Sequence, residues 1–412
     1  MNVNFKKLYF LLAVFVLALS ASAQQTEDFK YRRSSIYSVM INHTDQQFAK
    51  EIKDAFLQIP TPDKFNDHNL SIKILNMDNK LKGVKSEKEN EQITKFLEDN
   101  KVASRLVARW FNRDKFTGVC DMNLVKTRGL YGYNEFDRVM SEKSVRSEAL
   151  LMDAGEDLIG NTFVLVNDIR YIDKSKGSKT VGGILRVLGS IASAYTGVNF
   201  DDLTDDLADM AESLKGFKVK INTFLYRLEW NDDVAYPFYK DQYSGNPNDE
   251  KRINFENSRD KYRLKYVGKQ ESSGSTTSFL GIKEEEPVLM VRKACQRAID
   301  ENISNLQYSF EEFRTKSPLM SVMPLKALVG MKEGITENSR FEVLEVIEDE
   351  NGSHEYNRVG IIKPVKNLIW DNRFMALEEG ALNSTLGATT FEKVSGGEFA
   401  EGMLIKEIDS KK

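Results

Sequence analysis

The residues with the clearest chemical potential in this chain are three carboxylates near the end of one predicted helix. Asp153, Glu156 and Asp157 directly precede an apolar segment that predicts a central strand. Two carboxylates held together can act as general acid and general base, so these residues are candidates for a hydrolase site. The chain contains 62 Asp and Glu residues, and a solvated surface position is the simpler explanation for these three. A carboxylate hydrolase is therefore one open hypothesis.

Other chemical signatures in the chain are incomplete. The three histidines, His43, His68 and His354, are isolated from one another, and no H-E-x-x-H or C-x-x-C spacing exists. Residues 176–180 are similar to the end of a phosphate-binding loop, but Ser178 separates the glycine from the second lysine. We therefore assign no catalytic, cofactor-binding or metal-ligating residue. The sequence favours a protein that is not an enzyme and that carries no cofactor.

The first 23 residues predict a secretory signal peptide. Lys6 and Lys7 precede an apolar run at residues 8–19, and Ala21 and Ala23 form an A-x-A cleavage site. The apolar run is shorter than the roughly 20 residues that a membrane-spanning helix needs. No cysteine follows the cleavage site, so no residue there can accept a lipid. We expect an exported mature chain with no transmembrane segment and no lipid anchor.

Charge and composition exclude one class of partner. The chain has 58 Lys and Arg against 62 Asp and Glu, and loss of the two leader lysines takes its net charge from −4 to −6. Binding to nucleic acid is driven by neutralisation of phosphates, so an acidic chain argues against it. With 29% charged and 41% hydrophobic residues, the composition is that of a globular protein. The length suggests two or three domains.

Two cysteines both lie in apolar patterns. Cys120 alternates with apolar residues as in a strand, and Cys295 follows the spacing of a helix. Both positions fit small buried hydrophobic residues. Export to an oxidising compartment leaves a disulfide between them as the alternative.

Dense apolar segments predict a mixed sheet with flanking helices. Strands are expected at residues 34–41, 161–173 and 217–230, and helices at residues 44–59, 93–111 and 284–306. In the third strand the apolar alternation changes phase at Asn222 and Thr223, which predicts a β-bulge. Residues 241–278 are polar and predict turns and linkers. Together these elements predict an α+β domain at residues 24–317.

An almost uncharged segment interrupts this domain. Residues 180–215 predict a helical hairpin inserted between two strands, with apolar residues repeating every three or four positions. The hairpin could pack on its own sheet, or it could bind a partner or a membrane. Seven residues of its two stripes form the predicted interaction surface: Ile184, Leu188, Ile191, Tyr195, Leu203, Leu207 and Met210.

The sequence changes character near Pro318. Short segments of strand-forming residues alternate with turns, and Asn351 and Gly352 predict a hairpin turn. Strands are expected at residues 341–347, 356–362, 365–370 and 403–408. This pattern predicts a small antiparallel β-barrel as a second domain, residues 318–412.

Aromatic residues in predicted loops support a third hypothesis, a module that binds a glycan or another small ligand. Tyr131, Tyr133, Tyr236, Phe238 and Tyr239 could stack on sugar rings. Tyrosine also packs commonly at the ends of sheets, so packing stays open as the alternative.

Three segments carry resemblances to known families. Residues 149–166, which end in Asn-Thr-Phe-Val-Leu-Val, and Trp110-Phe111-Asn112-Arg113 resemble uncharacterised exported proteins of Gram-negative envelopes. Residues 330–334, leading into 341–344, are similar to the opening turn and strand of the SH3-like barrel in curli- and flagellar-assembly accessory proteins. These resemblances imply an SH3-like barrel, a place in the periplasm or at the outer membrane, and an envelope protein partner or self-association. The sequence therefore predicts a non-enzymatic cell-envelope assembly, scaffolding or interaction protein, with the hydrolase and the ligand-binding module as alternatives.

Overall fold

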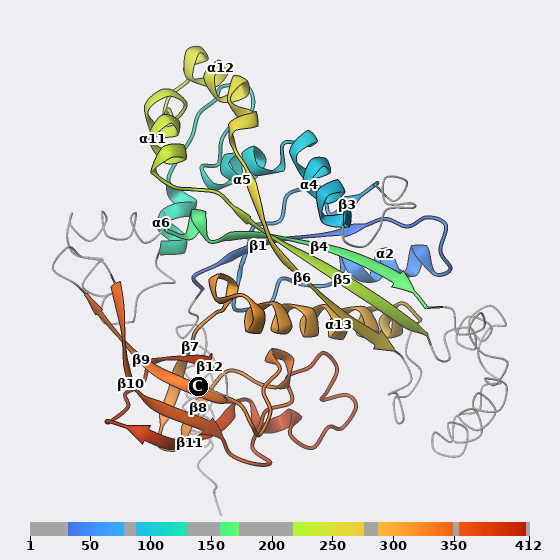
Figure 1. Cartoon of the computed structure of the whole chain (residues 1–412), viewed down its shortest axis with the longest axis vertical. Coiled ribbons are helices and arrows are strands. Elements are labelled where there is room, and N and C mark those ends of the chain that lie inside the picture. Colours follow the sequence, from blue (N-terminus) through green and yellow to red (C-terminus); the bar gives the residue numbers. More distant parts are fainter. Residues whose placement is uncertain are drawn as a thin grey trace, which may run out of the picture.

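The computed structural model describes six parts of the chain, and they build a mixed α+β protein (Figure 1). The described residues are 32–77, 88–129, 157–172, 217–275, 287–348 and 354–408. The predicted signal peptide and the whole predicted hairpin at residues 180–215 lie outside these ranges, as do Tyr131 and Tyr133. The expected fold class is confirmed at this level: a mixed sheet with helices on it precedes a closed antiparallel ring of strands.

The sheet is mixed because its first half is parallel and its second half antiparallel. Its strand order is β2-β1-β4-β5-β6, and β3 pairs with the other end of β1. Strand β1 runs parallel to β2, β3 and β4, whereas β5 is antiparallel to both β4 and β6. The strands are β1 (Ser35–Ile41), β2 (Asn66–Asp67), β3 (Ile74–Leu75), β4 (Thr162–Tyr171), β5 (Lys218–Leu228) and β6 (Leu264–Ser275).

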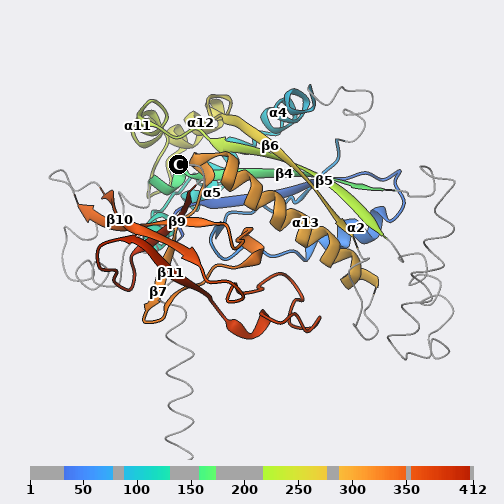
Figure 2. The ribbon, with the colours of Figure 1, turned by 60° about the horizontal axis from the view of Figure 1, so that its bottom comes forward.

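Helices cover both faces of this sheet (Figures 1 and 2). One face packs against α2 (Ala49–Leu57) and α13 (Pro287–Ser309), the other against α4 (Glu89–Asp99) and α5 (Val102–Trp110). Successive residues of β4 therefore enter opposite cores: Phe163 lies in the α13 core and Val164 in the α5 core. Shorter helices are α6 (Asn123–Gly129), α11 (Asp232–Asp241), α12 (Asp249–Asn257) and η5 (Arg259–Lys261). A strand buried on both faces has the continuous apolar run that made β4 predictable.

Three predictions for this part of the chain were wrong. The helix expected at residues 93–111 is two helices, α4 and α5, because Lys101 takes a left-handed φ of 54° between them. Cys120 lies in a loop before α6 and not in a strand. The polar residues 241–278 contain α12 and the long strand β6. On β6, small residues face α13: the Ser272 hydroxyl donates to the Ala298 carbonyl oxygen at 2.7 Å.

The bulge predicted at Asn222 and Thr223 of β5 was wrong, and the irregularity lies in the neighbouring strand. Strand β5 pairs with β4 without interruption, and its register to β6 shifts between Leu225 and Tyr226, which leaves Val267 of β6 as the extra residue. The phase change in β5 has a different cause. In the first half of β5 the apolar residues, such as Ile221, face the α13 core. From Phe224 onward apolar residues also occupy the opposite face and enter the α5 core, so the apolar pattern changes phase although the strand is regular.

The C-terminal strands close into an antiparallel barrel in the order β10-β11-β8-β7-β12-β9. Its strands are β7 (Ser317–Val322), β8 (Leu325–Ala327), β9 (Arg340–Glu348), β10 (His354–Pro364), β11 (Thr389–Gly396) and β12 (Leu404–Ile408), and its short helices are η6 (Glu311–Phe313), η7 (Met331–Glu333) and η8 (Ser384–Leu386). The strand expected at residues 365–370 is instead a loop, in which the Trp370 backbone N–H donates to the Thr389 hydroxyl at 3.0 Å. The strands β7, β8 and β11 were not expected.

Candidate functional site

The described residues on either side of the predicted hairpin lie at one end of the sheet. The last described pair of β4 and β5 is Tyr171 with Val219, and the Ile172 N–H donates to the Lys218 carbonyl oxygen at 2.8 Å beyond it. The ring of Tyr171 lies 5.6 Å from that of Phe217. Hydrogen bonds and aromatic packing therefore hold β4 and β5 together up to the point in the chain where residues 173–216 are inserted. All seven predicted surface residues lie outside the described ranges.

The two faces of the sheet differ at this end. On the α13 face, Val219 and Ile221 are fully buried. On the opposite face the side chains are charged: those of Arg170, Lys220 and Glu271 are 43%, 44% and 56% exposed. Neither face of the described sheet thus offers a bare apolar surface beside the insertion.

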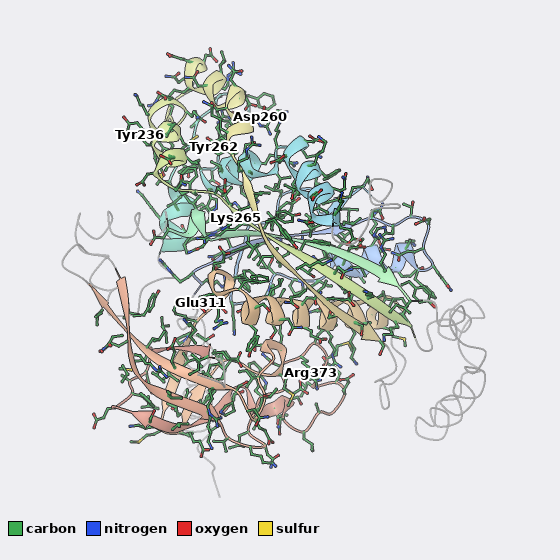
Figure 3. The ribbon with its side chains drawn as sticks, in the orientation of Figure 1. Tyr236, Asp260, Tyr262, Lys265, Glu311 and Arg373 are labelled. Carbon is green, nitrogen blue, oxygen red and sulfur yellow. The ribbon has the colours of Figure 1, made fainter. Side chains whose placement is uncertain are left out.

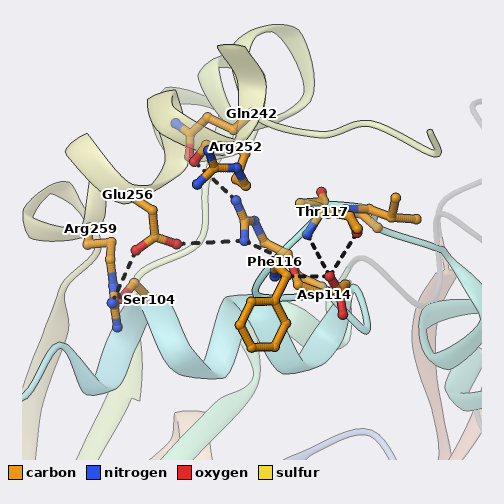
Figure 4. Close-up of polar contacts among 12 residues, drawn as sticks. Ser104, Asp114, Phe116, Thr117, Gln242, Arg252, Glu256 and Arg259 are labelled. Atoms are coloured by element: carbon orange, nitrogen blue, oxygen red, sulfur yellow. Dashed lines mark hydrogen bonds and ion pairs between the residues drawn. The ribbon is translucent and has the colours of Figure 1, made fainter. Parts of the chain in front are cut away.

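A second exposed feature is the turn that carries Phe116. The Asp114 Oδ1 accepts from the backbone N–H groups of Phe116 at 2.9 Å and Thr117 at 2.6 Å, and from the Thr117 hydroxyl at 2.8 Å (Figure 4). Gly118 has a φ of +73°, and a Cβ there would lie 2.8 Å from the side chain of Arg252. The turn is therefore rigid, yet the Phe116 side chain is 82% exposed. A large aromatic on a fixed support is typical of an interface anchor.

Of the three hydrolase candidates, only Asp157 lies within the described residues. Asp153 and Glu156 lie outside them. Asp157 is 74% exposed and forms an ion pair with Arg33 at 3.5 Å. This arrangement is that of a surface carboxylate.

The glycan candidates separate in the same way. Phe238 is fully buried, and Tyr239 packs against the same core. Tyr236 points outward from α11 and is 66% exposed, with the Lys240 Nζ 5.6 Å from its ring centroid (Figure 3). Of the three candidates that the structure describes, Tyr236 alone is therefore exposed enough to stack on a ligand.

One histidine forms part of a buried polar pair. The His43 Nε2 lies 2.6 Å from the Asp168 Oδ1, and the Arg170 Nε donates to the same oxygen at 2.8 Å. Burial raises the pKa of Asp168, but these two contacts outweigh it and the pKa is lowered. Within the described residues, the buried His43 Nδ1 has no hydrogen-bond partner. This pair holds the segment after β1 against β4.

The second buried histidine is a packing residue. The Arg128 Nη1 donates to the His68 Nδ1 at 2.8 Å, and the guanidinium lies 4.4 Å from the Trp110 ring centroid. The His68 Nε2 donates to the Leu106 carbonyl oxygen at 3.0 Å. Burial and the charge of Arg128 lower the pKa of His68 well below its ordinary value, so the ring stays neutral.

The disulfide is absent, because the two cysteines lie on opposite faces of the sheet. Cys120 belongs to the α5 core and Cys295 to the α13 core, and both are free and buried. Burial raises the pKa of both thiols, that of Cys295 to about 12. Both act as small hydrophobic residues, as the apolar patterns predicted.

A polar seam, between α13 and the barrel, was not foreseen from the sequence. Lys293 and Arg297 of α13 both form ion pairs with Glu379, although the Lys293 side chain is only 1% exposed. Arg297 also donates to the Phe374 carbonyl oxygen at 2.9 Å. Close to Glu311, where α13 gives way to the barrel (Figure 3), the Lys406 Nζ lies 2.5 Å from a Glu311 carboxylate oxygen.

Two cavities in the described structure lie beside α13. The larger, of about 40 Å³, lies at one end of the barrel and includes Lys64 in its wall. The smaller, of about 20 Å³, lies between α2 and α13 and includes Asp300. Asp300 is only 7% exposed, and its Oδ2 has no hydrogen-bond partner among the described residues. Burial raises its pKa to about 7.

Searches for other functional signatures give no assignment. No protein-family model and no curated protein sequence matches this chain. Within the described ranges, no three His, Cys, Asp or Glu side chains gather as they would around a metal ion. Of the helices that the structure describes, none combines the length and the apolar composition of a membrane-crossing helix.

Proposed function

We propose that this chain is an exported, non-enzymatic assembly, scaffolding or interaction protein of the cell envelope, and that residues 180–215 form its main contact element. The position of the insertion carries the proposal. The antiparallel strands β4 and β5 stay paired up to Tyr171 and Val219, and a hairpin at this point needs only about two to five residues to turn. Residues 173–216 are therefore not needed to build the sheet.

The apolar stripes of this segment favour contact with another molecule over packing on its own sheet. On one face of the adjoining sheet end, α2 and α13 already cover the apolar side chains. On the other face, Arg170, Lys220 and Glu271 are charged and partly exposed. Burying Leu188 or Leu207 against those charges would desolvate them without compensation. A partner protein, or a second copy of this chain, avoids that cost.

Two features of the described structure support an interaction role. Phe116 is presented on a rigid turn, as an interface anchor would be. The barrel supplies a second unit, and we propose that it is SH3-like and serves in assembly, as the resemblance at residues 330–344 implies.

The proposal predicts that loss of the apolar stripe abolishes association without unfolding the protein. Residues 173–216 are replaced by an Asn-Gly turn, and separately Leu188→Asp is compared with Ser193→Asp, which adds the same charge away from the stripe. Light-scattering mass and pull-down from the envelope fraction are the measurements. We expect excision and Leu188→Asp to remove a complex that Ser193→Asp retains. Unchanged mass and unchanged capture in the excised protein would refute the role of this segment.

A further inference from the structure

The larger cavity at the seam lies at a place where small ligands often bind, the mouth of a barrel beside a second unit. Its barrel residues come from the starts of β7 and β9 and from the ends of β8 and β12. Antiparallel neighbours run in opposite directions, so these positions share one end of the barrel. The volume of about 40 Å³ holds about three water molecules, since one water needs about 10–15 Å³ on this scale.

Lys64 contributes a positive charge to the cavity wall. Among the described residues, none forms a hydrogen bond or an ion pair with the Lys64 ammonium. The turn that carries it is fixed, because the Phe65 N–H donates to the Pro62 carbonyl oxygen at 2.9 Å and the Phe65 ring stacks on Phe313 at 5.2 Å. An unpaired cation held in a partly buried position attracts an anion.

Two neighbouring carboxylates limit the charge that this anion can carry. Burial lowers the pKa of Lys64, and Glu333 and Glu407 offset this only in part. The Glu333 Oε2 already accepts from the Gly330 N–H at 2.7 Å and from the Asn372 Nδ2 at 2.8 Å, and these donors offset part of its charge. A doubly charged phosphate would be repelled by both acids, and a singly charged group is repelled less.

The rest of the wall is mixed: Gln307, Arg314 and Thr315 are among its polar residues, and four residues form an apolar part. Val329, Ile335, Phe341 and Ile405 belong to the barrel core and line the cavity. We propose that the cavity binds a small aliphatic carboxylate, whose charged group pairs with the Lys64 ammonium and whose stem lies against these four residues. The volume limits the ligand to about the size of acetate or propionate. The carboxylate can belong to a free acid or to the C-terminal residue of a peptide.

The test uses the full chain with propionate as the probe, and ligand-detected NMR measures the binding of propionate. We expect Lys64→Met to weaken propionate binding at least tenfold and Lys64→Arg to keep it within about threefold. Lys73→Met, which alters a lysine at the smaller cavity, is the matched control and should leave the affinity unchanged. From formate to propionate the affinity should rise by up to about fourfold per added carbon, and pentanoate should lose this gain.

A second comparison separates the two sources of carboxylate. The tripeptide Gly-Gly-Ala is tested as its free acid and as its C-terminal amide. Binding of the free acid alone indicates a peptide end, and binding of propionate without either peptide indicates a free acid. If Lys64→Met does not fold, Lys64→Gln replaces it. Unchanged propionate affinity in the folded neutral variant, or phosphate binding as tight as propionate binding, would overturn the proposal.

Discussion

At the residue scale, the side chains with catalytic potential serve to join elements. His43 bonds to Asp168 across two strands, and His68 receives a hydrogen bond from Arg128. The sequence correctly predicted both cysteines as buried hydrophobic residues, yet it could not show that a sheet separates Cys120 from Cys295. Sequence spacing reports which residues share an element, whereas partners that are distant in sequence depend on how the elements pack.

Asp300 gives a prediction at this scale. Its folded pKa of about 7 exceeds the unfolded value near 4, so the folded state binds the proton more tightly. The stability that depends on this proton is complete below about pH 4 and is lost as pH rises through about 7. Asp300→Asn should therefore raise the free energy of unfolding at pH 8 by about 2–4 kcal/mol and change it little at pH 4.5. Urea unfolding at the two pH values measures both effects.

The control for this prediction is Asp157→Asn, which removes a carboxylate that is 74% exposed. It should change the free energy of unfolding by less than about 1 kcal/mol at either pH, because exposed ion pairs contribute little. Equal destabilisation by Asp300→Asn at pH 4.5 and pH 8 would contradict the role given to its charge.

At the element scale, apolar density determined what the sequence could predict. Strands β1, β4 and β5 carry long apolar runs and were expected close to their observed bounds. Strand β6 was missed because glycine and serine face α13 there, where bulkier residues would keep the helix away. At Gly274, a Cβ would lie 1.9 Å from the Ala294 carbonyl oxygen. The same small residues that hid the strand in the sequence permit its close packing.

This close approach predicts a large effect from one methyl group. Gly274→Ala should force β6 and α13 apart and lower the free energy of unfolding by about 1–3 kcal/mol. Gly245→Ala is the matched control, because a Cβ there meets nothing within 4 Å. It should alter stability by less than about 0.5 kcal/mol. The two variants are compared by thermal and urea unfolding, and equal effects would show that α13 does not pack on β6 as described.

At the scale of the whole molecule, the sheet and the barrel meet across charged groups and not across an apolar core. The barrel core and the two sheet cores are separate clusters. Glu379 binds Lys293 and Arg297 from 86 and 82 residues away in the sequence, so no local pattern could reveal the contact. Polar contacts between two separately packed units are typical of interfaces that can open.

The seam therefore predicts that one carboxylate couples the unfolding of the two units. Glu379→Gln leaves the ammonium of Lys293, whose side chain is 1% exposed, without its ion pair to Glu379, and it should lower the free energy of unfolding by about 2–4 kcal/mol. It should also split a single calorimetric transition into two, because the barrel loses both of its ion pairs through Glu379 to α13. Glu392→Gln removes an exposed pair with Lys363 within the barrel and should do neither. If the two variants melt alike, the seam is held by its neutral contacts, such as the Ser304 hydroxyl donating to the Glu333 carbonyl oxygen at 2.9 Å.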